Sequence, residues 1–361
     1  MTILQNDQPD KHSKWEAHAW LRKHSARKGG RMCMNPLVGV ASVGVTAAGV
    51  AHMGGVFRCA SLGGCPVCGP TMRQRKHAVI SELLTKAHLS GCRVMFVTAT
   101  ASHSAANPLA DTYRLVASSW SAAFSGQAAL NPAYLGQIRV LEVTHGVNGW
   151  HPHVHGVIVL DRMSERRAKG FCEAAGTRYR QAVRARGGRV SNTRHGFDVQ
   201  AARSVKDIAA YIAKIDSTSA QTAATAISFE LVRGDLKTAG GVAGRSPAQI
   251  LRDAVDGSLT SKALYNEYEV AIKGKHLISI GRKLAARFDV VDLPDDLCAE
   301  AEVSGEIVLT FSFAAGAWRH FADTGQLGAV AAACSSFVRD GERLPDWVLD
   351  AVTDCFAPSS P

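Results

Sequence analysis

The sequence lacks the long apolar runs that cross a membrane. Among its 361 residues, no stretch of 18 or more is continuously apolar, and the first 30 hold no apolar segment of the signal-peptide kind. We therefore expect a cytoplasmic protein with no membrane partner. Hydrophobic residues make up 46% of the chain and charged residues 20%, so wholesale disorder is excluded as well.

The sequence also lacks an even set of cysteines. It has nine and no export signal, which argues against a disulfide framework and for a reducing environment. Three of them form the pattern Cys59-x5-Cys65-x2-Cys68, in which two thiolates spaced as Cys-x2-Cys can grip one tetrahedral ion. With Cys33 as the fourth ligand and His52 as its rival, the pattern predicts a structural zinc site.

Acidic residues are few in most of the chain. The net charge is +10, but residues 289–361 hold 13 acidic and three basic residues, so the preceding residues carry a net charge of +20. A basic body of this kind is typical of a nucleic-acid-binding protein. The side chains that we expect to contact DNA phosphates are Arg166, Arg167, Arg178, Arg203 and Lys206.

Hydrophobic periodicity predicts alternating strands and helices. Helices are expected over residues 71–89, 109–124, 164–186, 205–215 and 247–272, and strands over 93–100, 137–144, 151–160 and 197–200. The order β-α-β-β-α-β is the split βαβ pattern. It predicts an α+β fold, in which an antiparallel sheet carries helices on one face, as in ferredoxin-like and RRM-like domains. A Cys-rich zinc module precedes this core, and a C-terminal extension follows it.

The predicted strand 151–160 carries histidines at alternate positions. Side chains alternate between the two faces of a strand, so His153 and His155 project to the same side and can meet one divalent ion. His151 has the same parity and is a rival ligand, although Pro152 beside it disturbs the local geometry.

A turn at residues 146–149 pairs this strand with the preceding one and brings a carboxylate to the histidines. If the two ends of the turn pair, Glu142 lies opposite His153, and if its last two residues are central, Glu142 lies opposite His155. Two histidines and one carboxylate leave open positions for water and phosphate. This ligand set predicts a site for Mg²⁺ or Mn²⁺.

The predicted helix 205–215 places an acidic residue one turn before a tyrosine. Asp207 and Tyr211 are four residues apart and share a helix face. A tyrosine has a pKa of ~10, so it needs a base or a nearby cation to act as a nucleophile at neutral pH. Lys214 and a metal-bound phosphate can supply the positive field, while Asp207 can position Tyr211 or activate a water.

Taken together and in this order, the motifs resemble those of the HUH endonucleases, specifically the replication initiators of rolling-circle plasmids. Residues 96–100 (FVTAT) resemble the first motif of the family, and residues 152–156 (PHVHG) resemble its metal-binding motif. Residues 207–214 resemble its tyrosine motif, with one tyrosine and thus one covalent site per active centre. The resemblance spans about residues 31–287 and includes the cysteine knuckle.

The resemblance implies a site-specific nickase and strand transferase. Tyr211 would attack one strand of origin DNA, single-stranded at the nick site, and leave a 5′-phosphotyrosine and a free 3′-OH. The strand is later rejoined or released. Glu142, His153 and His155 would hold the catalytic metal, and a host helicase and polymerase are the expected protein partners.

We divide the chain accordingly into five regions. They are a flexible basic arm (1–32), the zinc module with a basic helix (33–90), the nuclease core (91–216), the rest of the initiator region (217–288) and an acidic C-terminal region (289–361). Two alternatives stay open. One is a transposase or conjugative relaxase with the same chemistry, and the other is a non-catalytic, zinc-dependent DNA-binding regulator.

Overall fold

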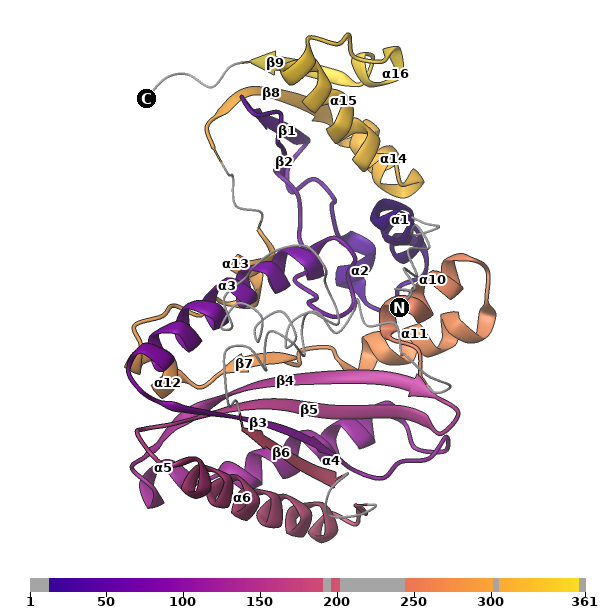
Figure 1. The fold of residues 1–361 in the computed structure, drawn as a ribbon. Coiled ribbons are helices and arrows are strands. Elements are labelled where there is room, and N and C mark those ends of the chain that lie inside the picture. The colour runs from indigo at the N-terminus through magenta and orange to yellow at the C-terminus, as the bar shows by residue number, and fades with distance from the viewer. Residues whose placement is uncertain (1–12, 191–195, 202–243, 301–304, 357–361) are drawn as a thin grey trace, which may run out of the picture. The chain divides into compact units, whose positions relative to one another are not determined.

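The computed structural model describes residues 13–190, 196–201, 244–300 and 305–356 (Figure 1). The chain forms two compact units. The first combines Met1–Met72, Leu251–Lys262 and Asp295–Pro361, and the second combines Arg73–Ile250 and Ala263–Pro294. Within the described residues, no helix is both long enough and apolar enough to span a bilayer.

The second unit is organised around a five-stranded antiparallel sheet with the spatial order β6-β3-β5-β4-β7. The strands are β3 (Arg93–Thr100), β4 (Tyr134–Gly146), β5 (Gly149–Leu160), β6 (Phe197–Ala201) and β7 (Ile278–Ile280). Helices α4 (Leu109–Phe124) and α6 (Glu165–Ala185) pack against each other and cover one face of the sheet (Figure 1). The predicted α+β fold with an antiparallel sheet is confirmed.

Strand alternation explains which face the helices cover. Val154 and Ile158 of β5 point towards the helices and are fully buried, whereas His153 and His155 have the opposite parity. Gly156 lies under the ring of Trp120 from α4, so the glycine allows the helix to approach the strand. The histidine face is therefore the face opposite α4 and α6. It is not open along its whole length, because Val157 and Val159 share its parity and are fully buried.

Substitution of Gly156 with alanine is expected to destabilise this unit. An added Cβ would come within 2.2 Å of Cη2 of Trp120, which is fully buried and cannot move without opening the core. We expect a loss of about 1–3 kcal/mol in the free energy of unfolding, measured by urea denaturation. The matched control is Gly170→Ala on α6, where a Cβ meets nothing within 4 Å and helix propensity favours alanine. Equal stability of the two variants would contradict the packing argument.

The first unit contains a second antiparallel sheet, with the order β2-β1-β8-β9. Its strands are β1 (Val40–Thr46), β2 (Ala51–Gly54), β8 (Ile307–Ala314) and β9 (Val352–Phe356). Helices α14 (Ala315–Thr324) and α15 (Leu327–Asp340) pack on it. Residues 33–90 and 289–361 were expected to form separate regions, whereas β1 and β8 pair directly. Local patterns carry no signal for strands that pair across more than 250 residues.

Residues 14–32 differ from the expected flexible arm because they form two helices. These are α1 (Lys14–His24) and α2 (Lys28–Met32). Ser13 and Glu16 form a capping box that satisfies backbone groups at the start of α1. Leu21 is buried, and the guanidinium of Arg22 donates to Asp323 at 2.6 Å. The segment was expected to be a solvated basic arm, but the buried Leu21 and the ion pair between Arg22 and Asp323 hold it in place.

The remaining helices are α3 (Cys68–Leu89), α5 (Gln127–Leu130), α10 (Pro247–Val255), α11 (Leu259–Ala271), α12 (Arg282–Arg287), α13 (Asp295–Ala299) and α16 (Asp346–Leu349). Of these, α3 and the pair α10 and α11 correspond to predicted helices, whereas the short helices α5, α12, α13 and α16 were not predicted. The single helix expected over 247–272 is divided into α10 and α11. Gly257 lies between them with a φ of 97°, a conformation that ends a helix and that glycine adopts without strain.

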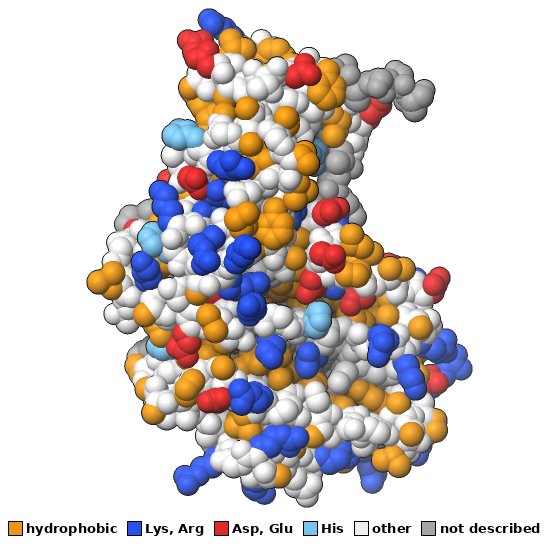
Figure 2. Space-filling view, turned by 180° about the vertical axis from the view of Figure 1, so that it is seen from behind, with side chains coloured by type: hydrophobic (Ala, Val, Ile, Leu, Met, Phe, Trp, Pro, Cys, Tyr) orange, Lys and Arg blue, Asp and Glu red, His pale blue; other side chains and the backbone are white. Residues whose placement is uncertain are grey.

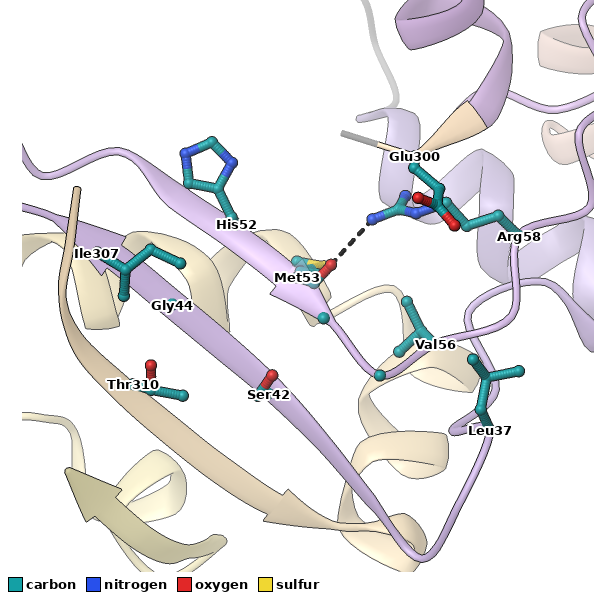
Figure 3. Close-up of a pocket in the computed structure, with 12 residues that line it drawn as sticks. Leu37, Ser42, Gly44, His52, Met53, Val56, Arg58, Glu300, Ile307 and Thr310 are labelled. Carbon is teal, nitrogen blue, oxygen red and sulfur yellow. Dashed lines mark hydrogen bonds between the residues drawn. The ribbon is translucent and has the colours of Figure 1, made fainter. Parts of the chain in front are cut away.

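The sheet of the first unit carries a hollow on one of its faces (Figure 3). Its volume is about 330 Å³, and it is lined by Ser42 and Gly44 of β1 and by Arg58. The guanidinium of Arg58 donates to the backbone oxygen of Met53 at 2.9 Å. A Cβ at Gly44 would come within 2.7 Å of Ile307, so the glycine keeps β1 and β8 closely packed here.

Candidate metal and nucleic-acid site

Glu142, His153 and His155 come together on the face of the five-stranded sheet opposite α4 and α6. Gly146 pairs with Gly149, and this register places Glu142 opposite His153. The first of the two registers considered for the hairpin is thus confirmed. The Nε2 atoms of His153 and His155 lie 3.0 and 2.7 Å from Oε2 of Glu142.

These three side chains can hold one metal ion. Their ligand atoms lie within 4.8 Å of one another, and the side chain of Glu142 is only 11% exposed. Burial raises the pKa of the Glu142 carboxyl, but hydrogen bonds with His153 and His155 outweigh it and hold the pKa well below its usual range. The carboxylate is therefore ionised at neutral pH, as a metal ligand must be.

His151 does not join this group of ligand atoms. Its Nε2 lies 2.9 Å from the hydroxyl of Thr100, which also donates to the backbone oxygen of Pro152 at 3.1 Å. Burial, followed by the charges of His153 and His103, lowers the pKa of His151 to about 4. The rival ligand is therefore a neutral imidazole that is already engaged by a neighbouring strand.

Threonines of β3 support the histidines from the adjacent strand. Thr98 pairs with His155 in the sheet, and its hydroxyl lies 3.4 Å from Nδ1 of that ring. Thr100 pairs with His153 and holds His151. Hydrogen bonds to the second ring nitrogen orient a metal-binding imidazole. The threonines of the FVTAT segment thus lie where they can orient the ring of His155 and hold His151 in place.

His103 is a neighbour of this site that the sequence analysis missed. It lies in the loop 101–108 between β3 and α4, and its ring stacks on His151 with centroids 4.6 Å apart and planes inclined by 15°. A histidine three residues beyond a strand end follows no strand parity or ligand spacing. Only the path of the loop over the hairpin brings it to His151.

Cys33, Cys59, Cys65 and Cys68 form a second group of converging ligands, in the first unit. Their sulfur atoms lie within 4.8 Å of one another, and three pairs are separated by 3.7, 3.8 and 3.9 Å. A zinc ion with Zn–S bonds of ~2.3 Å at the centre of a regular tetrahedron requires sulfur atoms ~3.8 Å apart. The four cysteines therefore have the spacing of a tetrahedral metal site, and the rival His52 is not part of the group.

Hydrogen bonds connect the segment around Cys33 to two helices far apart in the sequence, α1 and α14. Hydrogen bonds from Cys33, Cys59 and Cys65 lower the pKa of the Cys68 thiol, which favours its thiolate form. Arg22 of α1 donates to the backbone oxygen of Cys33 at 2.6 Å. The indole of Trp318 from α14 donates to the backbone oxygen of the next residue, Met34, at 2.8 Å. The cysteine cluster thus lies at the centre of the packing of this unit.

The basic residues expected to bind DNA differ in their surroundings. Arg166 and Arg167 are exposed in the first turn of α6, which belongs to the second unit. Lys and Arg side chains are frequent on the face of the protein that Figure 2 shows. Arg178 is partly buried and donates from Nε to the backbone oxygen of Ala123 at 2.7 Å. This contact links α6 to α4, so Arg178 has a packing role.

Several predicted site residues lie outside the described residues. The proposed nucleophile and its neighbours, Asp207, Tyr211 and Lys214, belong to them, as do Arg203 and Lys206. The described chain reaches Ala201 at the end of β6. β6 pairs with β3 at the edge of the same sheet that carries the histidines.

Comparison with known proteins finds two similar chains from Streptomyces. A protein named Protein rep, from Streptomyces lividans, is 29% identical over 316 aligned residues, which cover 70% of this chain and 68% of the relative. A protein named Neomycin resistance protein, from Streptomyces cyanogenus, is 29% identical over 149 residues, about a third of each chain. No protein-family model and no solved structure matches this chain.

Proposed function

We propose that this protein is a rolling-circle replication initiator that nicks one strand of origin DNA. The observation that carries the proposal is the convergence of Glu142, His153 and His155 on the sheet face opposite α4 and α6. It is supported by the similarity to a protein named Rep over two thirds of both chains and by the basic charge of the body. The plasmid-replication role rests on that similarity, whereas the nuclease chemistry rests on the site.

In this proposal, Glu142, His153 and His155 hold Mg²⁺ or Mn²⁺, which supplies positive charge that polarises the phosphate and neutralises charge as it develops. The phenolic oxygen of Tyr211 forms a bond to phosphorus while the bond from phosphorus to O3′ breaks. The 3′ oxygen takes up a proton, so the products are a 5′-phosphotyrosine and a free 3′-OH. The phosphotyrosine keeps the energy of the phosphodiester, so rejoining needs no ATP.

The other groups serve the tyrosine and the DNA. Lys214 favours the loss of the phenolic proton, and Asp207 positions Tyr211 or activates the water that releases the strand. Exposed residues such as Arg166 and Arg167 contact phosphates of the strand, with an affinity that falls as salt rises. The four cysteines hold a structural zinc ion, which the sulfur spacing of 3.7–3.9 Å fits.

Loss of the phenolic oxygen is expected to abolish the covalent intermediate. Wild-type protein, incubated with Mn²⁺ and 3′-labelled single-stranded oligonucleotides that tile the DNA flanking the gene, should convert one of them into a labelled protein adduct. Tyr211→Phe should give no adduct on a denaturing gel. The matched control is Tyr179→Phe, because Tyr179 is fully buried and its hydroxyl has no partner in the described part of the chain.

An adduct that persists in Tyr211→Phe would refute the assignment of the nucleophile. Wild-type protein that binds zinc and DNA but cleaves no oligonucleotide would instead favour the non-catalytic regulator. A transposase or relaxase would cleave DNA at a transposon end or a transfer origin, so the identity of the cleaved oligonucleotide separates these classes.

A further inference from the structure

The sheet face opposite α4 and α6 carries a row of four imidazoles rather than two. The ring centroids of His155 and His153 are 4.7 Å apart, those of His153 and His151 are 5.3 Å apart, and those of His151 and His103 are 4.6 Å apart. The row begins at the metal-ligand group and ends in the loop 101–108. The nitrogen atoms of His151 and His103 are not among the converging ligand atoms, so these two histidines need another role.

The ring of His151 is held in place. The Nε2 atom of His151 is engaged with the hydroxyl of Thr100, and the backbone of His151 pairs with Thr144 on β4. One of its faces stacks on His103 with the planes inclined by only 15°. His151 thus acts as a fixed support that sets the plane of His103.

The loop that carries His103 is also held in place. The backbone N–H of Ser102 donates to the backbone oxygen of Arg189 at 2.8 Å, and that of Ser104 donates to the side chain of Asn107 at 2.8 Å. At the hairpin turn, Gly149 has a φ of 80°, and a Cβ there would come within 2.8 Å of the Cα of Ala105. The loop therefore lies directly on the turn of the histidine hairpin.

The ring of His103 is itself committed to little else. It is partly exposed, and its one hydrogen bond within the described part of the chain is a long contact of 3.5 Å from Nδ1 to the backbone oxygen of Ala101. Its orientation thus depends on the stack with His151. A partly exposed aromatic ring held by stacking beside a phosphate-binding site is suited to stack on a base of a single strand.

We propose that His103, supported by His151, is a substrate-binding residue that stacks on a nucleobase flanking the cleaved phosphate. The inference rests on the proposed nickase function and adds a binding position to it. A strand whose phosphate lies at Glu142, His153 and His155 places its neighbouring nucleotides within reach of a row of imidazoles whose centroids are ~5 Å apart. Stacking is tolerant of base identity, so His103 contributes affinity more than sequence choice.

The test compares two substitutions of His103 on the oligonucleotide that wild-type protein cleaves in the presence of Mn²⁺. His103→Ala removes the ring, and we expect KM to rise about tenfold while kcat changes less than twofold, in line with the loss of one stacked base. His103→Phe keeps an aromatic face, and we expect KM within about threefold of the wild-type value. The matched control is His88→Ala. His88 is exposed near the end of α3 and precedes β3, whereas His103 follows the other end of that strand.

A direct readout uses the same oligonucleotide with 2-aminopurine placed in turn at the nucleotides on either side of the nick. Stacking quenches its fluorescence, so one position should be quenched by wild-type protein and by His103→Phe but not by His103→Ala. Equal KM values for wild type and His103→Ala, or a His103→Phe variant as weak as His103→Ala, would overturn the proposal. Failure of the nickase function is distinguishable, because wild-type protein itself would then cleave none of the oligonucleotides.

Discussion

Replacement of His153 with alanine is expected to lower metal-dependent cleavage of single-stranded origin DNA by about a thousandfold or more. Its Nε2 lies 3.0 Å from the carboxylate of Glu142, so the substitution removes one of three converging ligand atoms. The remaining pair cannot fix one ion against a phosphate. Cleavage rates in Mn²⁺ under single-turnover conditions measure the loss, and fluorescence anisotropy of a labelled oligonucleotide measures DNA binding, which should stay within about threefold.

The matched control for this variant is His320→Ala, an exposed histidine on α14 of the other unit. It should cleave at the wild-type rate. Glu142→Gln keeps the shape of the carboxylate but removes its charge, and we expect a loss of the same order as for His153→Ala. Cleavage by His153→Ala within about tenfold of wild type would exclude this histidine from the catalytic group.

Replacement of Cys65 with serine is expected to remove bound zinc and to unfold much of the first unit. Binding of zinc to four thiolates contributes ~10–16 kcal/mol of apparent free energy in small domains, as much as the whole stability of a typical protein. Cys65 is buried within the cysteine cluster, where neighbouring residues contact both α1 and α14. We expect zinc content to fall from one equivalent to near zero and proteolysis within the first 72 residues to accelerate.

The control for the cysteine variant is Cys355→Ser on β9, which is exposed and lies outside the cluster. It should keep one equivalent of zinc and the wild-type unfolding temperature. Wild-type protein without bound zinc, or Cys65→Ser with unchanged zinc content and unfolding, would show that these four cysteines do not hold a zinc ion. The variant also tests whether the C-terminal segment depends on the cluster, because Trp318 donates to Met34 beside it.

The candidate metal group could be predicted from the sequence because the side-chain period of a strand is two. Given a hairpin with its turn at residues 146–149, parity alone places Glu142 on the face of His153 and His155. The register between those alternatives depended on which turn residues pair, and the structure resolves it through the pairing of Gly146 with Gly149. The Cys-x2-Cys spacing was equally informative, since it is a local constraint on two ligands of one ion.

Other features could not be read from local pattern, since each depends on segments far apart in the chain. The pairing of β1 with β8 joins residues more than 250 positions apart. Arg178 is predicted to contact DNA from its place in a basic helix, and its hydrogen bond to the backbone oxygen of Ala123, which links α6 to α4, could not be predicted. His103 has no motif of its own and reaches the histidine row because its loop lies on the hairpin turn.

The sequence by itself determined the order of strands and helices over residues 93–201, the face of each residue in the histidine hairpin and the grouping of cysteines. These follow from periods and spacings of a few residues. Tertiary structure alone decided which strands pair across the chain, how α1 is anchored and which histidines extend the metal-ligand group. Those outcomes depend on long-range packing, because a contact between distant segments stabilises both of them and the local pattern of neither segment predicts the other.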